Sequence, residues 1–208
     1  MKTYKNEKNG TILLMLCVVV SFIVIFVSDG FAAADTVREE CLRLHVLADT
    51  DSEADQSVKL QVRDAILEET GELFRSCLTA GEAVSRASER KEEIEAVAER
   101  VLRENGFSYG AEVFIEEEYF GTRQYEGVSL PAGNYTALKV VLGEGEGHNW
   151  WCVMFPPLCL PAVTEKQEDS VYGVFGENGG NLVTGKSGYK VKFRIVEIVE
   201  NIIEAIKS

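Results

Sequence analysis

The chain has few of the residues from which enzymes build metal and nucleophilic centres. Only two of its 208 residues are histidines, His45 and His148, which excludes a histidine-rich metal centre. No two of the five cysteines stand in C-x-x-C spacing, so a four-cysteine zinc site is disfavoured. No G-x-S-x-G or H-E-x-x-H pattern occurs. We therefore expect a non-enzyme without catalytic residues, cofactor or metal ligands.

Positive charge is scarce as well. The chain has 21 lysines and arginines against 34 acidic residues, a formal net charge of -13 at pH 7. Because nucleic acids and anionic membrane surfaces would repel such a chain, neither is an expected partner. The simplest interpretation of the excess is that it keeps an exported domain soluble.

The N-terminus carries the one long apolar run, residues 12–27, which three lysines precede and Ala32-Ala33-Ala34 follows. This order predicts a signal peptide of residues 1–34, cleaved after Ala34. The run slightly exceeds the usual apolar core of a signal peptide and falls short of the ~20 residues that span a bilayer comfortably. A retained membrane anchor at residues 12–27 is therefore the alternative.

Four cysteines remain after the leader: Cys41, Cys77, Cys152 and Cys159. In an exported protein this even number allows three disulfide pairings, among which sequence cannot choose. Cys152 and Cys159 are nearest in sequence, and the turn expected at Pro156-Pro157 can bring them together. The alternative is that both are small buried apolar residues.

The remaining pattern predicts an α+β fold: a mainly antiparallel sheet of about four strands with two or more helices packed on one face, plus a C-terminal amphipathic helix. Alternation predicts strands at 41–48, 109–116, 135–142 and 150–155, the last two joined as a hairpin through 143–149. Ser52 and Thr79 are expected to cap helices, one ending near Gly71 and one covering 83–104.

Four segments follow from these patterns. Residues 1–34 form the leader or anchor, 35–163 the α+β domain, 164–190 an acidic, glycine-rich and mobile connector, and 191–208 the C-terminal helix. That helix packs on its own domain or on a partner or membrane surface.

Two stretches imitate ligand motifs. Gly143, Gly145 and Gly147 resemble a phosphate loop, but the intervening glutamates would repel phosphate. The acidic residues from Asp49 to Asp55 resemble the start of a calcium loop, although Ala54 and Leu60 occupy its glycine and glutamate positions. Helix-capping acids in a strand-to-helix turn explain that stretch better, with weak calcium binding as the alternative.

The most distinctive run is NWWCVMFPPLC, residues 149–159. In a strand, Trp150 and Trp151 point to opposite faces, and the two prolines end the strand near Phe155. One alternative function is an exported cell-wall or peptide hydrolase that uses Cys152 or a carboxylate pair, although the apolar neighbours of Cys152 would raise its thiol pKa.

Residues 42–69, 130–159 and 191–197 resemble stage II sporulation protein R, and the WWC and PPLC elements are its most specific part. The resemblance implies a signalling protein of endospore-forming bacteria, made in the forespore and exported into the space between the two membranes. It also implies a partner, a membrane-embedded aspartic protease of the mother cell that processes the precursor of sigma-E. Residues 35–163 would be the signalling domain, and only the N-terminal segment would contact a membrane.

The tryptophans are candidates for contacting this partner, because aromatic residues dominate interface hot spots. Trp150 or Trp151 is the first candidate, and Arg43 and His45 are weaker ones. The alternative is that both rings lie in the core or against the helices.

Overall fold

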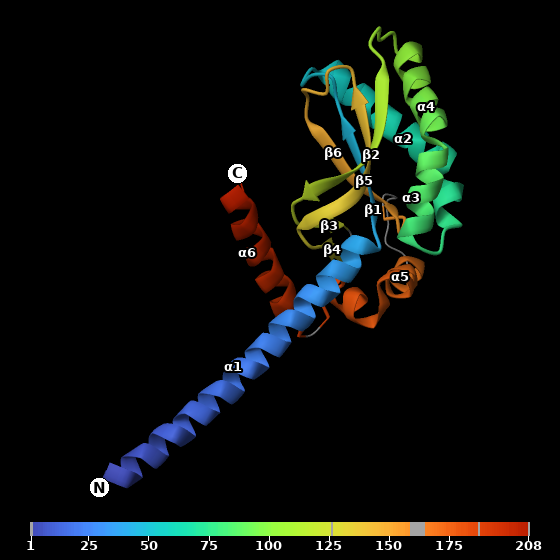
Figure 1. The fold of residues 1–208 in the computed structure, drawn as a ribbon. Helices are drawn as coiled ribbons and strands as arrows, with labels where there is room; N and C mark the ends of the chain where they lie inside the picture. The colour runs from blue at the N-terminus through green and yellow to red at the C-terminus, as the bar shows by residue number, and fades with distance from the viewer. Residues whose placement is uncertain (1, 126, 159–164, 187, 208) are drawn as a thin grey trace.

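The chain folds into a four-stranded sheet covered by helices, from which a long N-terminal helix extends (Figure 1). The structure, a computed structural model, describes residues 2–125, 127–158, 165–186 and 188–207. Its helices are α1 (Lys2–Glu39), α2 (Glu53–Arg75), α3 (Ala80–Glu89), α4 (Lys91–Glu104), α5 (Glu165–Val183) and α6 (Tyr189–Lys207). Its strands are β1 (Leu42–Leu47), β2 (Ala111–Phe120), β3 (Arg123–Tyr125), β4 (Val128–Leu130), β5 (Gly133–Leu142) and β6 (Asn149–Phe155).

The main sheet has the order β2-β5-β1-β6. β2 pairs with β5 and β6 with β1 in antiparallel fashion, whereas β1 and β5 are parallel. The predicted α+β fold with a mainly antiparallel sheet is confirmed. The predicted hairpin is wrong, because β1 lies between β5 and β6. The loop joining β5 to β6 crosses the end of β1, and Gly147 N donates to Ala48 O at 2.9 Å.

One face of the sheet, the helix face, packs against α2, α3 and α4 (Figure 1). Ser52 and Thr79 cap α2 and α3 as expected, since their side chains accept from the backbone N–H groups of Asp55 and Glu82. The helix after Ser52 runs past Gly71 to Arg75. The single helix expected over residues 83–104 is two helices, because Arg90 leaves helical geometry at φ -112° and ψ 17°.

The opposite face of the sheet, the outer face, is covered at one end only. There the β3–β4 hairpin, α5 and the last turns of α1 enclose a second core, which includes Val37, Phe120, Tyr135 and Phe175. The segment expected as a mobile connector thus contains a helix, α5, whose only non-helical residue is Gly176 with φ 65°. Gly179 allows close approach, because a Cβ there would lie 3.3 Å from Val37 Cγ2.

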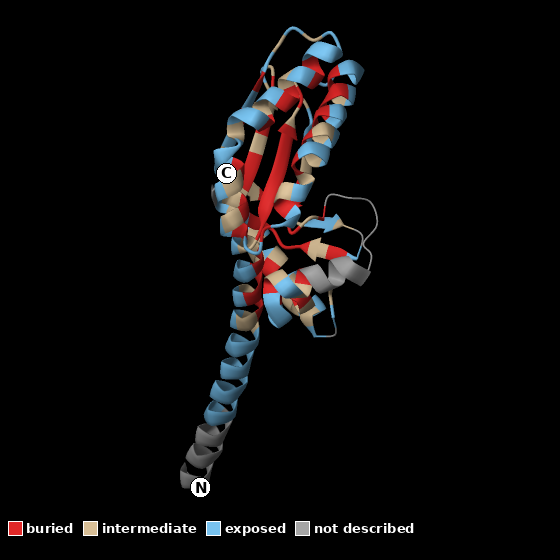
Figure 2. Cartoon of the chain, turned by 90° about the vertical axis from the view of Figure 1, so that its right-hand side faces the viewer, coloured by how far each residue is buried: buried red, intermediate tan, exposed pale blue. Residues whose placement is uncertain are grey.

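The two ends of α1 have different surroundings, as Figure 2 shows. The large apolar side chains from Leu13 to Phe26 are all exposed, by 40 to 69%. Ala33, Ala34 and Val37 are buried against the domain. By length and composition, residues 13–39 form the one candidate membrane span within the described part of the chain.

The C-terminal helix α6 confirms the predicted amphipathic segment. Its Val196 is buried, and Glu200 forms a 2.8 Å ion pair with Arg38 of α1. Ile198, Ile202 and Ile206 face solvent, with exposures of 52, 55 and 79%. The helix therefore docks on its own chain, but not through the whole of its apolar stripe.

Candidate functional site

The outer face gathers three of the four residues that the sequence suggests for partner binding. Arg43 and His45 alternate with the core residues of β1, and Trp151 lies opposite His45 on β6. Trp150 points to the helix face, as the alternation of a strand requires. The structure therefore groups Arg43, His45 and Trp151 and separates Trp150 from them.

Two polar contacts and a stacked ring fix the side chain of His45. Its Nδ1 lies 2.7 Å from Glu118 Oε2, its Nε2 lies 2.8 Å from Asn149 Oδ1, and only 4% of the residue is exposed. Its ring stacks on Trp151 with centroids 3.7 Å apart and planes at 19°. His45 thus fixes the orientation of the half-buried indole, and it offers little surface of its own.

Arg43 is fully buried, and its guanidinium packs against aromatic rings of the second core. Its guanidinium carbon lies 4.3 Å from the Phe120 ring centroid and 5.0 Å from that of Tyr135. Nε donates to Cys152 O at 3.0 Å and Nη2 donates to Tyr125 Oη at 2.9 Å. Its Nη1 is buried without a hydrogen-bond partner among the described residues.

These positions change the expectation for two of the candidates. Arg43 and His45 were the weaker candidates for partner contact, and both are buried. His45 stacks on Trp151, and the ring centroids of Trp151 and Phe120 lie 4.8 Å apart in a T-shaped arrangement. The exposed neighbours of Trp151 are Arg123 and Asn149. Partner binding through this face stays a prediction.

A group of charged side chains from β2 and β5 lies beside His45. Lys139 Nζ donates to Glu116 at 2.8 Å and lies 2.9 Å from Glu118. Burial opposes ionisation of Glu118, yet hydrogen bonds from Lys139 and His45 outweigh it and lower its pKa. The Lys139 pKa is raised, first by its hydrogen bond to Glu116. We did not predict these residues from sequence, although the alternation of Glu116, Glu118 and Phe120 along β2 was a usable signal.

Trp150 belongs to the helix layer. Its ring packs against the apolar core under α2, and the Arg63 guanidinium lies 4.2 Å from the ring centroid. Its indole Nε1 is buried without a hydrogen-bond partner. This environment is that of a structural residue. It agrees, for one of the two tryptophans, with the alternative that the rings lie in the core or against the helices.

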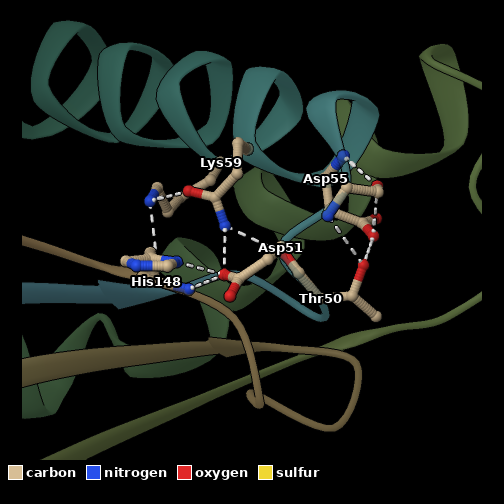
Figure 3. A network of polar contacts seen from close by, with 7 residues as sticks. Thr50, Asp51, Asp55, Lys59 and His148 are labelled. Atoms are coloured by element: carbon tan, nitrogen blue, oxygen red, sulfur yellow. Dashed lines mark hydrogen bonds and ion pairs between the residues drawn. The ribbon is translucent and has the colours of Figure 1, made fainter.

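The acidic loop after β1 is used for hydrogen bonds within the chain (Figure 3). Asp51 Oδ1 accepts from His148 N at 2.6 Å, and Lys59 Nζ donates to His148 O at 2.7 Å. Burial lowers the pKa of Lys59. The described residues contain no group of three potential metal-binding side chains. These contacts tie the β1–α2 loop to the loop before β6.

Asp55, in the first turn of α2, belongs to the same network of hydrogen bonds. It accepts from the hydroxyls of Thr50, Tyr109 and Ser52, the last two at 2.5 and 2.8 Å. The hydrogen bond from Thr50, followed by that from Tyr109, lowers the pKa of Asp55. Burial, together with the Asp55 carboxylate, raises the Tyr109 pKa. The acids of this loop therefore act as helix-capping and loop-bridging groups.

The cysteines differ in state. Cys152 is disulfide-bonded, whereas Cys41 and Cys77 are buried free thiols. Burial raises the Cys41 pKa to about 12, so this thiol is unreactive at neutral pH. Cys159 lies outside the described residues, and the Cys152–Cys159 pairing stays a prediction. A disulfide-bonded Cys152 has no thiolate with which to act as the nucleophile of a hydrolase.

Comparison with known proteins identifies the family. Residues 38–165 match the family described as stage II sporulation protein R. This range covers more than half of the chain.

The chain belongs to the stage II sporulation protein R family. Stage II sporulation protein R of Bacillus subtilis (strain 168) is 30% identical over 185 residues, which cover 80% of this chain and 83% of that protein. No solved structure matches the chain. The family match spans β1 to β6 and so includes both the outer-face residues Arg43, His45 and Trp151 and the acidic loop.

Proposed function

We propose that this chain is an exported sporulation signalling protein that activates a membrane-bound aspartic protease in the mother cell, which then processes pro-sigma-E. The observation that carries the proposal is membership of the stage II sporulation protein R family. The apolar N-terminal helix, which fits a signal peptide or a membrane anchor, supports export across the forespore membrane into the intermembrane space.

The chain acts in this proposal by binding and not by catalysis. An activator shifts a protease toward its active state only if it binds that state more tightly than the inactive one. The outer face supports such a role, because Trp151 is half-buried and preorganised by stacking on His45. A rigid aromatic anchor loses little conformational entropy on binding.

Reconstitution in a non-sporulating host tests this function. The chain, with its signal for export, is co-expressed with the protease and with pro-sigma-E, and processing is followed by the size of the sigma factor. We expect processing only when all three are present. An exported, folded chain that leaves pro-sigma-E unprocessed would contradict the proposal.

A further inference from the structure

The residues around the predicted cleavage site are part of the folded domain. α1 is one helix from Lys2 to Glu39 and passes through Ala32-Ala33-Ala34 without interruption. Ala33 is 3% exposed and Ala34 is fully buried, in a cluster with Leu182 of α5 and Val196 of α6. We call these four residues the anchor cluster.

Polar contacts join the same stretch of α1 to the rest of the chain. Asp29 forms an ion pair with Lys192 at the start of α6. Arg38 donates from Nε to Ala132 O at 3.0 Å and pairs with Glu200 at 2.8 Å. Because residue 192 pairs with 29 and residue 200 with 38, α6 runs alongside α1 in the same direction.

Close packing at Gly30 adds to these contacts. A Cβ at this buried glycine would lie 3.1 Å from Lys192 Cβ, tighter than most such contacts. Cleavage after Ala34 would remove Gly30 and half of the anchor cluster, and it would leave Leu182, Val196 and Lys192 without the surface on which they pack. The leader therefore carries part of the domain's own core.

The preceding part of α1 has the features of a bilayer span. Twenty uncharged residues, 9–28, separate Lys8 from Asp29, and at 1.5 Å per residue they cover about 30 Å, the thickness of a hydrocarbon core. Their large apolar side chains from Leu13 to Phe26 are exposed. The three lysines before the run favour a cytoplasmic N-terminus.

We infer that α1 is retained after export and that its apolar part stays in the lipid bilayer as a membrane anchor. The helix then serves two purposes, since residues 9–28 lie in lipid and one side of residues 29–39 packs on the domain. The domain is joined to the membrane by continuous helix and not by a flexible linker. In the proposed function, the activator then acts from the surface of the forespore membrane on a protease in the facing membrane. Only this last consequence rests on the proposed function.

The test compares the exported chain with its Ala32→Leu variant. Ala32 is exposed, so the substitution spares the core, and it removes the small residue that signal peptidase needs three positions before the cleaved bond. Both proteins are recovered from a host that exports them and examined by intact mass and by alkaline extraction of the membranes. A chain in which an efficiently cleaved signal peptide replaces residues 1–28 shows that the host peptidase is active.

We expect the exported chain and its Ala32→Leu variant both to keep residues 1–34 and to remain in the membrane, while the control is released. A released chain that begins at Asp35, together with a retained Ala32→Leu variant, would overturn the inference. Neither readout involves the protease, so failure here is distinguishable from failure of the proposed function.

Discussion

The imidazole of His45 stacks on the indole of Trp151 with ring centroids 3.7 Å apart, and Glu118 and Asn149 hold the two ring nitrogens of His45. The neighbouring Trp150 points to the other face of the sheet and packs under α2. Two adjacent tryptophans therefore have different surroundings, and substitutions at the two positions should have separable effects.

Trp150→Leu should mainly weaken the fold. Loss of part of a half-buried indole and of its contact with Arg63 should lower the free energy of unfolding by about 2 kcal/mol. Thermal unfolding of the detergent-solubilised chain measures this. Arg63→Met is the matched variant, because it keeps the indole and removes the cation over its ring, together with an ion pair to exposed Asp64, and it should cost less than Trp150→Leu. Equal stability of Trp150→Leu and the unchanged chain would contradict a structural role.

Arg43 should tolerate methionine better than lysine. Methionine fills much of the same space between Phe120 and Tyr135 without burying a charge. Lysine would keep a buried ammonium without the planar stacking of a guanidinium, which should cost about 3 kcal/mol or more. Unfolding midpoints of Arg43→Met and Arg43→Lys decide this. A less stable methionine variant would show that the charge itself holds the outer face together.

Asp55→Asn should destabilise the chain in a pH-dependent way. The folded-state pKa of Asp55 lies below the ordinary value of an aspartate, about 3.9, because Thr50, Tyr109 and Ser52 donate to its carboxylate. Its contribution is therefore complete above this value and is lost as the pH falls through the lower folded-state pKa. We expect Asp55→Asn to cost about 2 kcal/mol at pH 7 and progressively less below pH ~4.

Glu68→Gln is the control for Asp55→Asn, since Glu68 is an exposed residue of the same helix. Its effect on unfolding should be small and should change little between pH 7 and pH 3. If the cost of Asp55→Asn were the same at both pH values, the hydrogen bonds to its ionised form would not be its cause.

A chain that begins at Ser28 should be more stable than one that begins at Asp35. The longer chain keeps Asp29 for Lys192 and the two alanines of the anchor cluster, together with Phe31, which packs against it. Burial of this apolar surface should be worth about 2 kcal/mol. Unfolding midpoints of the two soluble chains measure the difference. Identical midpoints would mean that residues 28–34 contribute nothing to the core.

Local patterns predicted most of the elements. The alternation of Leu42, Leu44 and Val46 identified β1, and Ser52 and Thr79 identified two helix starts. These features depend on neighbours in sequence. The position of β1 between β5 and β6 depends on pairing across about 90 to 110 residues, which no local pattern records.

Two other features were not predicted from the sequence. Arg90 interrupts a stretch of helical spacing that contains neither glycine nor proline. The glycines of α5 suggested mobility, but Gly179 permits contact with Val37 of α1. Among the residues grouped on the outer face, the sequence suggested Arg43, His45 and Trp151. It did not suggest Glu118 or Lys139, which lie on strands far from β1 in sequence.

Processing of pro-sigma-E in the reconstituted host tests the role of the outer face most directly, with Trp151→Leu and Trp150→Leu compared at equal amounts of folded, exported chain. We expect Trp151→Leu to lower processing per folded molecule by about tenfold or more, the loss of one aromatic hot spot, and Trp150→Leu to leave it unchanged. Unchanged processing by folded Trp151→Leu would contradict the assignment of the outer face as the signalling surface.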